Sequence, residues 1–157
     1  MFGRKKKMMH LAATQDGDCI SLDMVPDPVF ADKLLGDGVA IIPRDNIVRS
    51  PADGQIVQVF DTYHAYSIKT DDGLELLVHI GLNTVELKGE GFKPKVKEGQ
   101  RVKTGDVLCE TDIGFIREKG YEIYTPTVIT NMDAVKSFKT ITGNVRAGES
   151  TVIEYGV

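Results

Sequence analysis

The chain has 157 residues, a net charge of −4, 41% hydrophobic and 27% charged residues. These values are typical of one soluble globular domain that is long enough to bury a core. The acidic balance argues against nucleic acid as a partner of the folded body. No apolar run is long enough to span a bilayer and none has the pattern of a secretory signal, so we expect a cytoplasmic protein.

The N-terminal segment carries a basic run from Arg4 to Lys7. We expect residues 1–10 to form a flexible basic tail and residues 11–157 to form a single folded domain. A cluster of this size supports at most a weak contact with an anionic membrane surface. His10 lies in the tail and is assigned no role.

The two cysteines, Cys19 and Cys109, follow no metal-binding or redox spacing. Both lie in apolar or mixed runs that are typical of strands. We therefore expect buried free thiols in a reducing cytoplasm.

The first predicted elements are a strand, a helix and a second strand. Residues 20–25 follow an Asp-Gly-Asp turn and are predicted as a strand. Asp27 as N-cap and Pro28 at the first helical position predict a helix of about two turns that ends at Gly36. Residues 39–42 are predicted as a short apolar strand.

A strand predicted at 55–60 leads into a segment in which His64 and His79 lie on either side of Thr-Asp-Asp-Gly at 70–73. Asp-Gly is a strong signal for a hairpin turn. A two-residue loop at 72–73 makes the histidines diagonal neighbours, and a loop at 71–72 sets them directly opposite. Either register places both rings on one face, whereas a three-residue loop would need a compensating bulge.

The alternation of side chains along the two strands predicts which residues share the face of the histidines. On this face the two strands present Phe60, Thr62, His64, Tyr66, Leu77, His79 and Gly81. The opposite face of the second strand is apolar and is expected to pack in the core, through Leu76, Val78 and Ile80. The rings would then lie beside a glycine that leaves room and a Thr62 hydroxyl that can orient a ring nitrogen.

The rest of the chain repeats short strands separated by glycine turns, and this repetition suggests an internal duplication. We predict a hairpin at 96–108, a helical turn at 112–120 and a strand at 127–130. A turn at 131–133, a strand at 139–145 and a last strand pair at 143–153 follow. The pattern predicts an all-β fold, an antiparallel sandwich or barrel with one or two short helices.

The segments His-Ala-Tyr-Ser-Ile at 64–68 and Glu-Leu-Leu-Val-His-Ile-Gly-Leu-Asn-Thr-Val-Glu-Leu-Lys-Gly-Glu-Gly-Phe at 75–92 carry a family resemblance. They resemble the glucose-type IIA component of the bacterial phosphoenolpyruvate-dependent sugar phosphotransferase system. The resemblance extends from about residue 16 to the C-terminus. It implies a phosphoryl carrier that requires no cofactor, because the energy of transfer already resides in the phosphohistidine of the donor.

The resemblance implies that His79 accepts the phosphoryl group through Nε2. His64 is then the supporting histidine, aided by Thr62 and by backbone N–H groups near Gly81. The implied donor is the small carrier HPr, and the implied acceptor is a cysteine on the IIB domain of a glucose-type permease. Histidine suits this chemistry because a neutral imidazole has a free lone pair and phosphoryl transfer needs mainly positioning and hydrogen-bond donors.

The resemblance also implies an apolar docking surface around the histidines. Its expected members are Val39, Ile41, Phe60, Leu77 and Val85, with Asp37 as an acidic residue at the rim. Many relatives have Asp after His-x-Gly-x, where this chain has Asn83. We therefore expect the docking of the donor to depend less on residue 83 and more on Asp37. The sugar that is transported stays open.

Two other functions are compatible with the pattern. The first is a regulator that binds transporters or kinases through the same face, a role that the family resemblance also implies. The second is a zinc metallopeptidase, which needs three protein ligands and lacks one here because Gly81 follows His79 by two residues. His64 and His79 are also half of a zinc site, which a carboxylate of a partner would complete.

Overall fold

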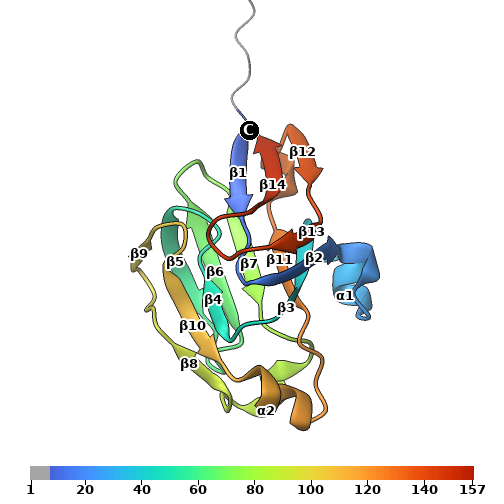
Figure 1. Ribbon diagram of the computed structural model, residues 1–157. Coiled ribbons are helices and arrows are strands. Elements are labelled where there is room, and N and C mark those ends of the chain that lie inside the picture. The colour runs from blue at the N-terminus through green and yellow to red at the C-terminus, as the bar shows by residue number, and fades with distance from the viewer. Residues whose placement is uncertain (1–7) are drawn as a thin grey trace, which may run out of the picture.

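The computed structural model describes residues 8–157, which form three antiparallel sheets (Figure 1). The strand orders are β13-β2-β3-β11-β7-β6-β5-β9, β1-β14-β12 and β4-β10-β8. The strands are β1 Met9–Ala12, β2 Gly17–Ser21, β3 Asp37–Pro43, β4 Ile47–Arg49, β5 Gly54–Val59, β6 Ala65–Thr70, β7 Glu75–His79, β8 Phe92–Pro94, β9 Arg101–Val102, β10 Val107–Thr111, β11 Thr125–Ile129, β12 Ser137–Thr140, β13 Gly143–Val145 and β14 Thr151–Gly156. The helical segments are η1 Leu22–Met24, α1 Pro28–Ala31, η2 Thr84–Leu87, α2 Ile113–Glu118 and η3 Met132–Ala134. The predicted all-β, antiparallel fold with two short helices is confirmed.

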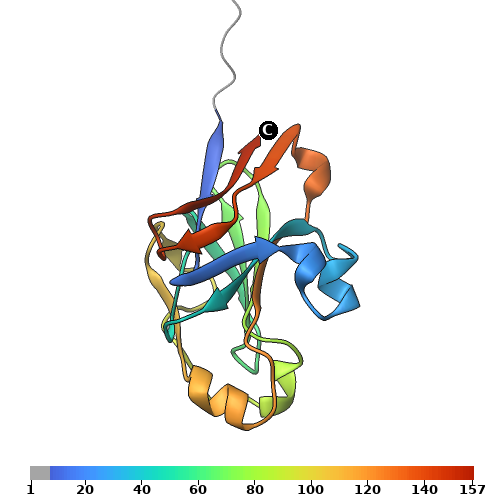
Figure 2. The same ribbon diagram turned by 45° about the vertical axis from the view of Figure 1, so that its right-hand side comes forward.

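The main core lies between the sheets, where side chains such as Tyr66 and Leu76 are at most 1% exposed. A smaller cluster packs beneath α1 and contains Leu22, Phe30 and Val128. Figure 2 shows α1 projecting from one side of the domain beside β2 and β3, while α2 lies at the end remote from β1 and β14. Helix α1 is therefore an appendage on the large sheet, and its position matters for the site below.

Helix α1 begins as predicted, because the Asp27 carboxylate accepts a hydrogen bond from the Val29 N–H at 3.0 Å. It ends after one turn rather than two. Lys33 takes a left-handed conformation with φ 56°, and the Leu34 N–H donates back to the Val29 carbonyl at 3.1 Å. A left-handed residue followed by such a bond closes a helix. The helix therefore ends at Ala31, and Lys33, not Gly36, is the left-handed residue that closes it.

The β6–β7 hairpin has a three-residue loop at 71–73. The Thr70 N–H donates to the Leu74 carbonyl at 2.8 Å, and the strands pair with Ala65 opposite His79. Both predicted registers, with their two-residue loops, are therefore wrong by one position. The expected bulge between β6 and β7 is absent from their continuous pairing, which runs from Ala65 to Lys69.

The register decides which side chains of the hairpin enter the core. Leu76, Val78 and Ile80 are at most 3% exposed, which confirms their predicted burial. Tyr66 is wholly buried with them, because it lies opposite Val78. The prediction that Tyr66 shares the face of the histidines is wrong.

Several predicted boundaries also change. Met9 and His10 pair with Tyr155 and Glu154 of β14, so they belong to a sheet and not to the predicted tail. The basic run at 4–7 lies outside the described residues. The predicted strand at 20–25 is the end of β2 followed by η1, and the predicted strand at 139–145 divides into β12 and β13.

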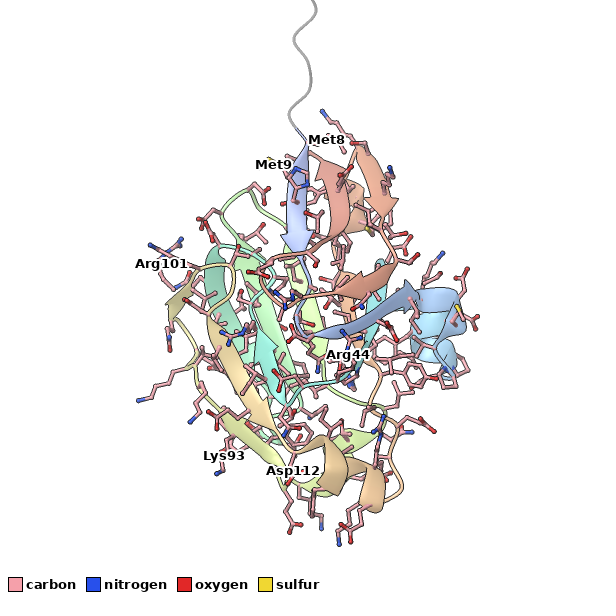
Figure 3. The ribbon with its side chains drawn as sticks, in the orientation of Figure 1. Met8, Met9, Arg44, Lys93, Arg101 and Asp112 are labelled. Carbon is pink, nitrogen blue, oxygen red and sulfur yellow. The ribbon has the colours of Figure 1, made fainter. Side chains whose placement is uncertain are left out.

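The predicted hairpin at 96–108 does not form. Its two halves pair elsewhere, β9 with β5 and β10 with β4 and β8. The helical turn at 112–120 is confirmed as α2, which Asp112 caps by accepting from the Phe115 N–H at 3.0 Å. Lys93 and Asp112 both lie near this end of the domain, and Arg101 lies at the edge strand β9 (Figure 3).

The two cysteines are free and buried, as predicted. Burial raises the pKa of the Cys109 thiol to about 11 and that of Cys19 to about 12, so both are protonated at neutral pH. The thiols are therefore inert fillers of the core rather than reactive groups.

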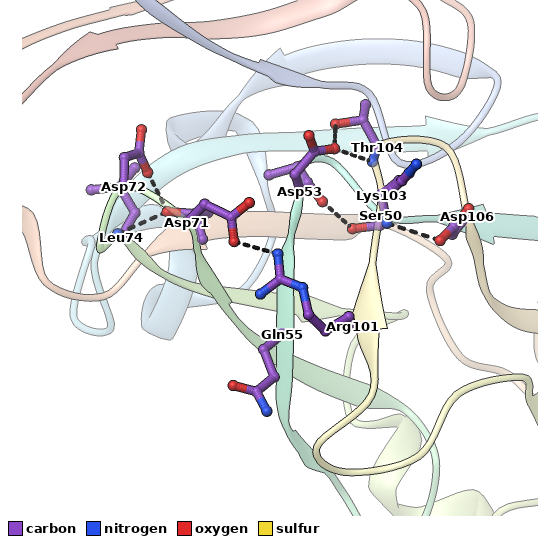
Figure 4. A network of polar contacts seen from close by, with 12 residues as sticks. Ser50, Asp53, Gln55, Asp71, Asp72, Leu74, Arg101, Lys103, Thr104 and Asp106 are labelled. Carbon is purple, nitrogen blue, oxygen red and sulfur yellow. Dashed lines mark hydrogen bonds and ion pairs between the residues drawn. The ribbon is translucent and has the colours of Figure 1, made fainter.

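A polar network holds the loop end of the β6–β7 hairpin (Figure 4). Arg101 donates to Asp71 at 2.7 Å, which ties the loop to β9. The Asp53 carboxylate accepts from the Thr104 N–H at 2.8 Å and from its hydroxyl at 3.1 Å. Both carboxylates accept hydrogen bonds from neighbouring residues, and they lie at the end of the hairpin remote from His79. The network therefore stabilises the scaffold and is separate from the histidines.

Candidate active site

The rings of His64 and His79 meet at the end of the hairpin opposite its loop. Their centroids are 5.0 Å apart and their planes make an angle of 82°, an edge-to-face arrangement. His79 is the last residue of β7, and His64 directly precedes β6. The predicted meeting of the two rings therefore occurs, although the predicted registers that led to it do not.

His79 is oriented by the turn that follows its strand. Its Nδ1 lies 2.7 Å from the carbonyl oxygen of Gly81. A carbonyl can only accept, so Nδ1 carries the proton and the lone pair of the neutral ring is on Nε2. The ring of Phe30, from α1, lies 5.1 Å from that of His79 at an angle of 58°. The turn thus fixes the tautomer, and α1 covers one side of the ring.

Gly81 is required by both its conformation and its surroundings. Its φ is +76°, and an added Cβ would lie 2.5 Å from Cγ2 of Thr84 and 3.0 Å from the carbonyl oxygen of Glu122. Thr84 is fully buried, and its hydroxyl donates to the Ile80 carbonyl at 2.5 Å. The turn that presents the Gly81 carbonyl to His79 is therefore held on several sides.

His64 is oriented by Thr62, whose Oγ1 lies 2.6 Å from Nδ1 of the ring. When the hydroxyl donates, Nδ1 accepts and the proton of the neutral ring is on Nε2. The ring of Phe60 lies 5.7 Å away, at an angle of 75°. His64 is only 5% exposed. Thr62 and Phe60 thus hold a ring that has little room to turn.

Burial sets the charge of both imidazoles. Desolvation, helped by the neighbouring His79, lowers the pKa of His64 from 6.5 to about 4. Desolvation also lowers the pKa of His79, although the Gly81 carbonyl and the negative charge of Asp27 act in the opposite direction. Both rings are therefore neutral at neutral pH, and a neutral ring is the form that has a lone pair for nucleophilic attack.

The expected docking surface is only partly exposed. Val39 and Ile41 are at most 1% exposed and pack in the core, so their assignment to a partner surface is wrong. Their strand, β3, lies inside the large sheet between β2 and β11, and both side chains point to the face that packs in the main core. Phe60 and Leu77 are half-buried near the rings, and Val85 is 50% exposed.

The exposed apolar residues that the sequence analysis missed lie on and around α1. Met24, Val29 and Leu34 are 66%, 39% and 68% exposed. They flank Phe30, which contacts His79, and we call Met24, Val29 and Leu34 the α1 face. The signal in the sequence was a short helix whose apolar residues are interspersed with Asp27, Asp32 and Lys33. No face was assigned to these residues from the sequence, and the predicted helix was one turn longer than α1.

Three polar residues lie at the edge of this region. The Asp37 carboxylate accepts from the Gly38 N–H at 2.8 Å and lies 4.0 Å from the Lys33 ammonium, so it is half engaged. Asn83 is exposed and left-handed, with φ 60°. Asn and Asp are the residues other than glycine that best tolerate this conformation. An Asp would therefore fit at position 83 as well as Asn does.

Zinc would find two ligands here, His64 and His79. No group of three metal-binding side chains occurs among residues 8–157. A tetrahedral zinc site takes four ligands, so the described part of the chain does not form one without ligands from another molecule.

The fold and the two rings define a class of protein: an antiparallel β domain that presents a neutral, oriented histidine beside a second one. Comparison with known proteins identifies the family. The family model for the phosphoenolpyruvate-dependent sugar phosphotransferase system, EIIA 1, matches residues 9–135. The chain belongs to this family and is a phosphoryl-carrier component of that system.

Relatives of nearly equal length support the assignment. The glucose-specific EIIA component of Bacillus cereus is 48% identical over 96% of this chain and 92% of its own length. That of Buchnera aphidicola is 45% identical over 94% and 91% of the two chains. The solved structure of glucose permease IIA from Mycoplasma capricolum superposes with a TM-score of 0.88 at 39% identity, over 94% of this chain and 96% of that one. No helix in the described residues is long and apolar enough to cross a membrane.

Proposed function

We propose that His79 is the residue that carries the phosphoryl group, on Nε2. The observation that carries this proposal is the 2.7 Å contact between Nδ1 of His79 and the Gly81 carbonyl. Because Nδ1 donates its proton to that oxygen, Nε2 is the nitrogen with a lone pair in the neutral ring. The lowered pKa of His79 supports the same assignment, since a protonated ring has no lone pair.

The reaction is a phosphoryl exchange between nitrogen and sulfur nucleophiles. The Nε2 lone pair of His79 forms a bond to phosphorus while the P–N bond to the imidazole of phospho-HPr breaks, and the HPr ring keeps that electron pair. A cysteine thiolate of a IIB domain then attacks the same phosphorus from the opposite side. The P–N bond to His79 breaks, and its electron pair returns to Nε2. In-line transfer of this kind depends on positioning and on donors for the three phosphoryl oxygens.

We assign the support of those oxygens to His64. With Nδ1 accepting from the Thr62 hydroxyl, the His64 ring presents Nε2–H, and the 5.0 Å between the two ring centroids supports a reach from this donor to a phosphoryl group on His79. A fixed donor in a partly desolvated site stabilises the charge that develops in transfer. The backbone near Gly81 is a second source of donors.

The partners fit an apolar surface with acidic residues at its rim. We propose that HPr and the IIB domain dock on the α1 face together with Phe60, Leu77 and Val85, and that Asp37 meets basic side chains of HPr. The matched relatives are named as glucose-specific components, so a glucose-type permease is the proposed acceptor. With partners of this kind, we propose that the protein acts in the cytoplasm.

Reconstitution of the relay with phospho-HPr and a IIB domain tests the proposal. His79→Gln should accept no phosphate, because glutamine offers no ring nitrogen. His64→Gln should accept in part but pass phosphate on slowly, because a donor to the transition state is lost. His10→Gln is the matched control: His10 lies on β1 in an exposed position, and its loss should change neither step. Full-speed onward transfer by His64→Gln would show that the role assigned to His64 is wrong.

A further inference from the structure

The turn that carries His64 contains an unusual backbone. Tyr63 has φ +59°, in the left-handed region that bulky side chains rarely adopt. Its N–H donates to the Phe60 carbonyl at 2.7 Å, and the Phe60 N–H donates to the Ala65 carbonyl at 3.0 Å. A turn of this kind between two strands, ending in a left-handed residue, usually has Gly or Asn at that place. Tyrosine is therefore a strained choice, and strained residues gather at functional sites.

The left-handed residue changes the direction of the ring that follows it. Ala65 lies opposite His79, so strict alternation along β6 would send the preceding side chain, His64, to the core face with Tyr66. The His64 carbonyl still accepts from the Ile80 N–H at 2.7 Å, yet its ring lies 5.0 Å from that of His79. The left-handed turn at Tyr63 directly precedes this departure of the His64 ring from the alternation of the strand.

The Tyr63 ring is held by a second segment. A Cβ at Gly89 would lie 3.4 Å from Cδ2 and 3.6 Å from Cε2 of this ring, so the ring lies against a residue that has no side chain. The same ring lines a surface hollow with Val59, Pro94 and Val96. A glycine or asparagine at position 63 would relieve the backbone but would lose this contact. Tyrosine therefore adds a packing contact with Gly89 that the turn conformation itself does not require, and we call this contact the anchor.

We propose that Tyr63 is a positioning residue for phosphoryl transfer. Its left-handed backbone directs the His64 ring to His79, and its ring, seated on Gly89, holds the Thr62–His64 arm in place. Tyr63 acts through His64 and is not itself assigned a contact with the phosphoryl group. This inference rests on the proposed function, and it predicts that onward transfer suffers while acceptance by His79 is largely kept.

Two substitutions separate the backbone from the ring. Tyr63→Val puts a β-branched residue where φ is positive, which that side chain opposes, so the turn should rearrange. Tyr63→Gly keeps the turn and removes the anchor. We expect onward transfer to fall about tenfold or more in Tyr63→Val and less in Tyr63→Gly, since small misplacements of a catalytic group slow reactions strongly. Tyr63→Phe, which keeps the ring, should transfer faster than Tyr63→Gly.

Lys69→Val is the matched control, because it places the same side chain at an exposed position within β6, where extended backbone suits valine. The second readout uses the unphosphorylated protein: the imidazole nitrogen shifts of His64, which report its tautomer, and the through-space contact between the rings of His64 and His79. Both should change in Tyr63→Val and stay parental in Lys69→Val.

The outcomes distinguish this inference from the proposed function. Parental nitrogen shifts, ring contact and onward transfer in Tyr63→Val would overturn the role of the backbone, and a Tyr63→Gly variant that equals Tyr63→Phe would overturn the anchor. Failure of the unaltered protein to take phosphate on His79 would instead contradict the proposed function. If Tyr63→Val fails to fold, the comparison of Tyr63→Gly with Tyr63→Phe still tests the role of the ring in positioning His64, and equal onward transfer in the two would overturn it.

Discussion

Replacing Gly81 with alanine should destabilise the protein much more than the same change at Gly73. Both glycines have positive φ, +76° and +95°, and both lie in turns that flank β7. They differ in the space around them. A Cβ at Gly81 would lie 2.5 Å from Thr84 Cγ2, whereas a Cβ at Gly73 would meet nothing within 4 Å. The pair therefore separates the effect of conformation from the effect of crowding.

The expected magnitudes follow from these contacts. A left-handed alanine costs about 1 kcal/mol or slightly more at either position. At Gly81 the new methyl group must also displace the buried Thr84 side chain, and overpacking costs about 1–3 kcal/mol. Thr84 then loses the hydrogen bond that its hydroxyl donates to the Ile80 carbonyl at 2.5 Å. We expect a loss of about 3 kcal/mol or more for Gly81→Ala and about 1 kcal/mol for Gly73→Ala.

Urea unfolding followed by circular dichroism measures both losses, and an unchanged slope would show that only the free energy of unfolding differs. Gly81→Ala should also slow the uptake of phosphate, because the Gly81 carbonyl holds Nδ1 of His79. Gly73→Ala should leave uptake unchanged. Equal losses of stability in the two variants would refute the reasoning, since they would show that the crowding around Gly81 is relieved without cost.

Three further predictions follow from the site. The pKa of His64 is lowered from 6.5 to about 4, so between these pH values the unfolded chain binds a proton that the folded chain does not. The free energy of unfolding should therefore fall by about 2 kcal/mol from pH 7 to about pH 5, and unfolding curves of His64→Gln should lack this part of the fall. Asn83→Asp should leave stability nearly unchanged but raise the rate of transfer from HPr at low salt and steepen the salt dependence of that rate. An unaltered rate and slope would count against a role for a negative charge at position 83 in the docking of HPr. Leu34→Asp on the α1 face should raise the KM for HPr at least several-fold, and it should not unfold the protein because Leu34 is 68% exposed. Transfer kinetics and a thermal melt measure the two effects, and parental kinetics would remove α1 from the docking surface.

The start of α1 and the burial of the second hairpin strand could be predicted from the sequence because each depends on local signals. Asp27 followed by proline defines a helix start through one cap and one fixed φ. Leu76, Val78 and Ile80 share one face of their strand and are all apolar, whereas the other face carries Glu75 and His79, so the inner face could be recognised. These features need no knowledge of distant contacts.

The end of α1, the position of the His64 ring and the burial of Val39 depend on backbone conformations and packing that the residue types alone do not indicate. Lys33 and Tyr63 both adopt positive φ, which neither side chain favours, and each changes the element in which it lies. The first lies where α1 closes, one residue before the exposed Leu34, and the second lies in the turn directly before His64. Val39 lies on the face of β3 that packs in the main core, and this packing involves strands distant in the sequence, which the local pattern does not reveal.

The most direct measurement locates the phosphate after incubation with phospho-HPr. We expect one acid-labile phosphate per chain, attached to residue 79 and bonded to Nε2, as phosphorus magnetic resonance and mass spectrometry of gently handled peptides would show. A phosphate on Nδ1 would contradict the tautomer that the Gly81 carbonyl imposes. A phosphate on another residue, or none, would contradict the central assignment of His79.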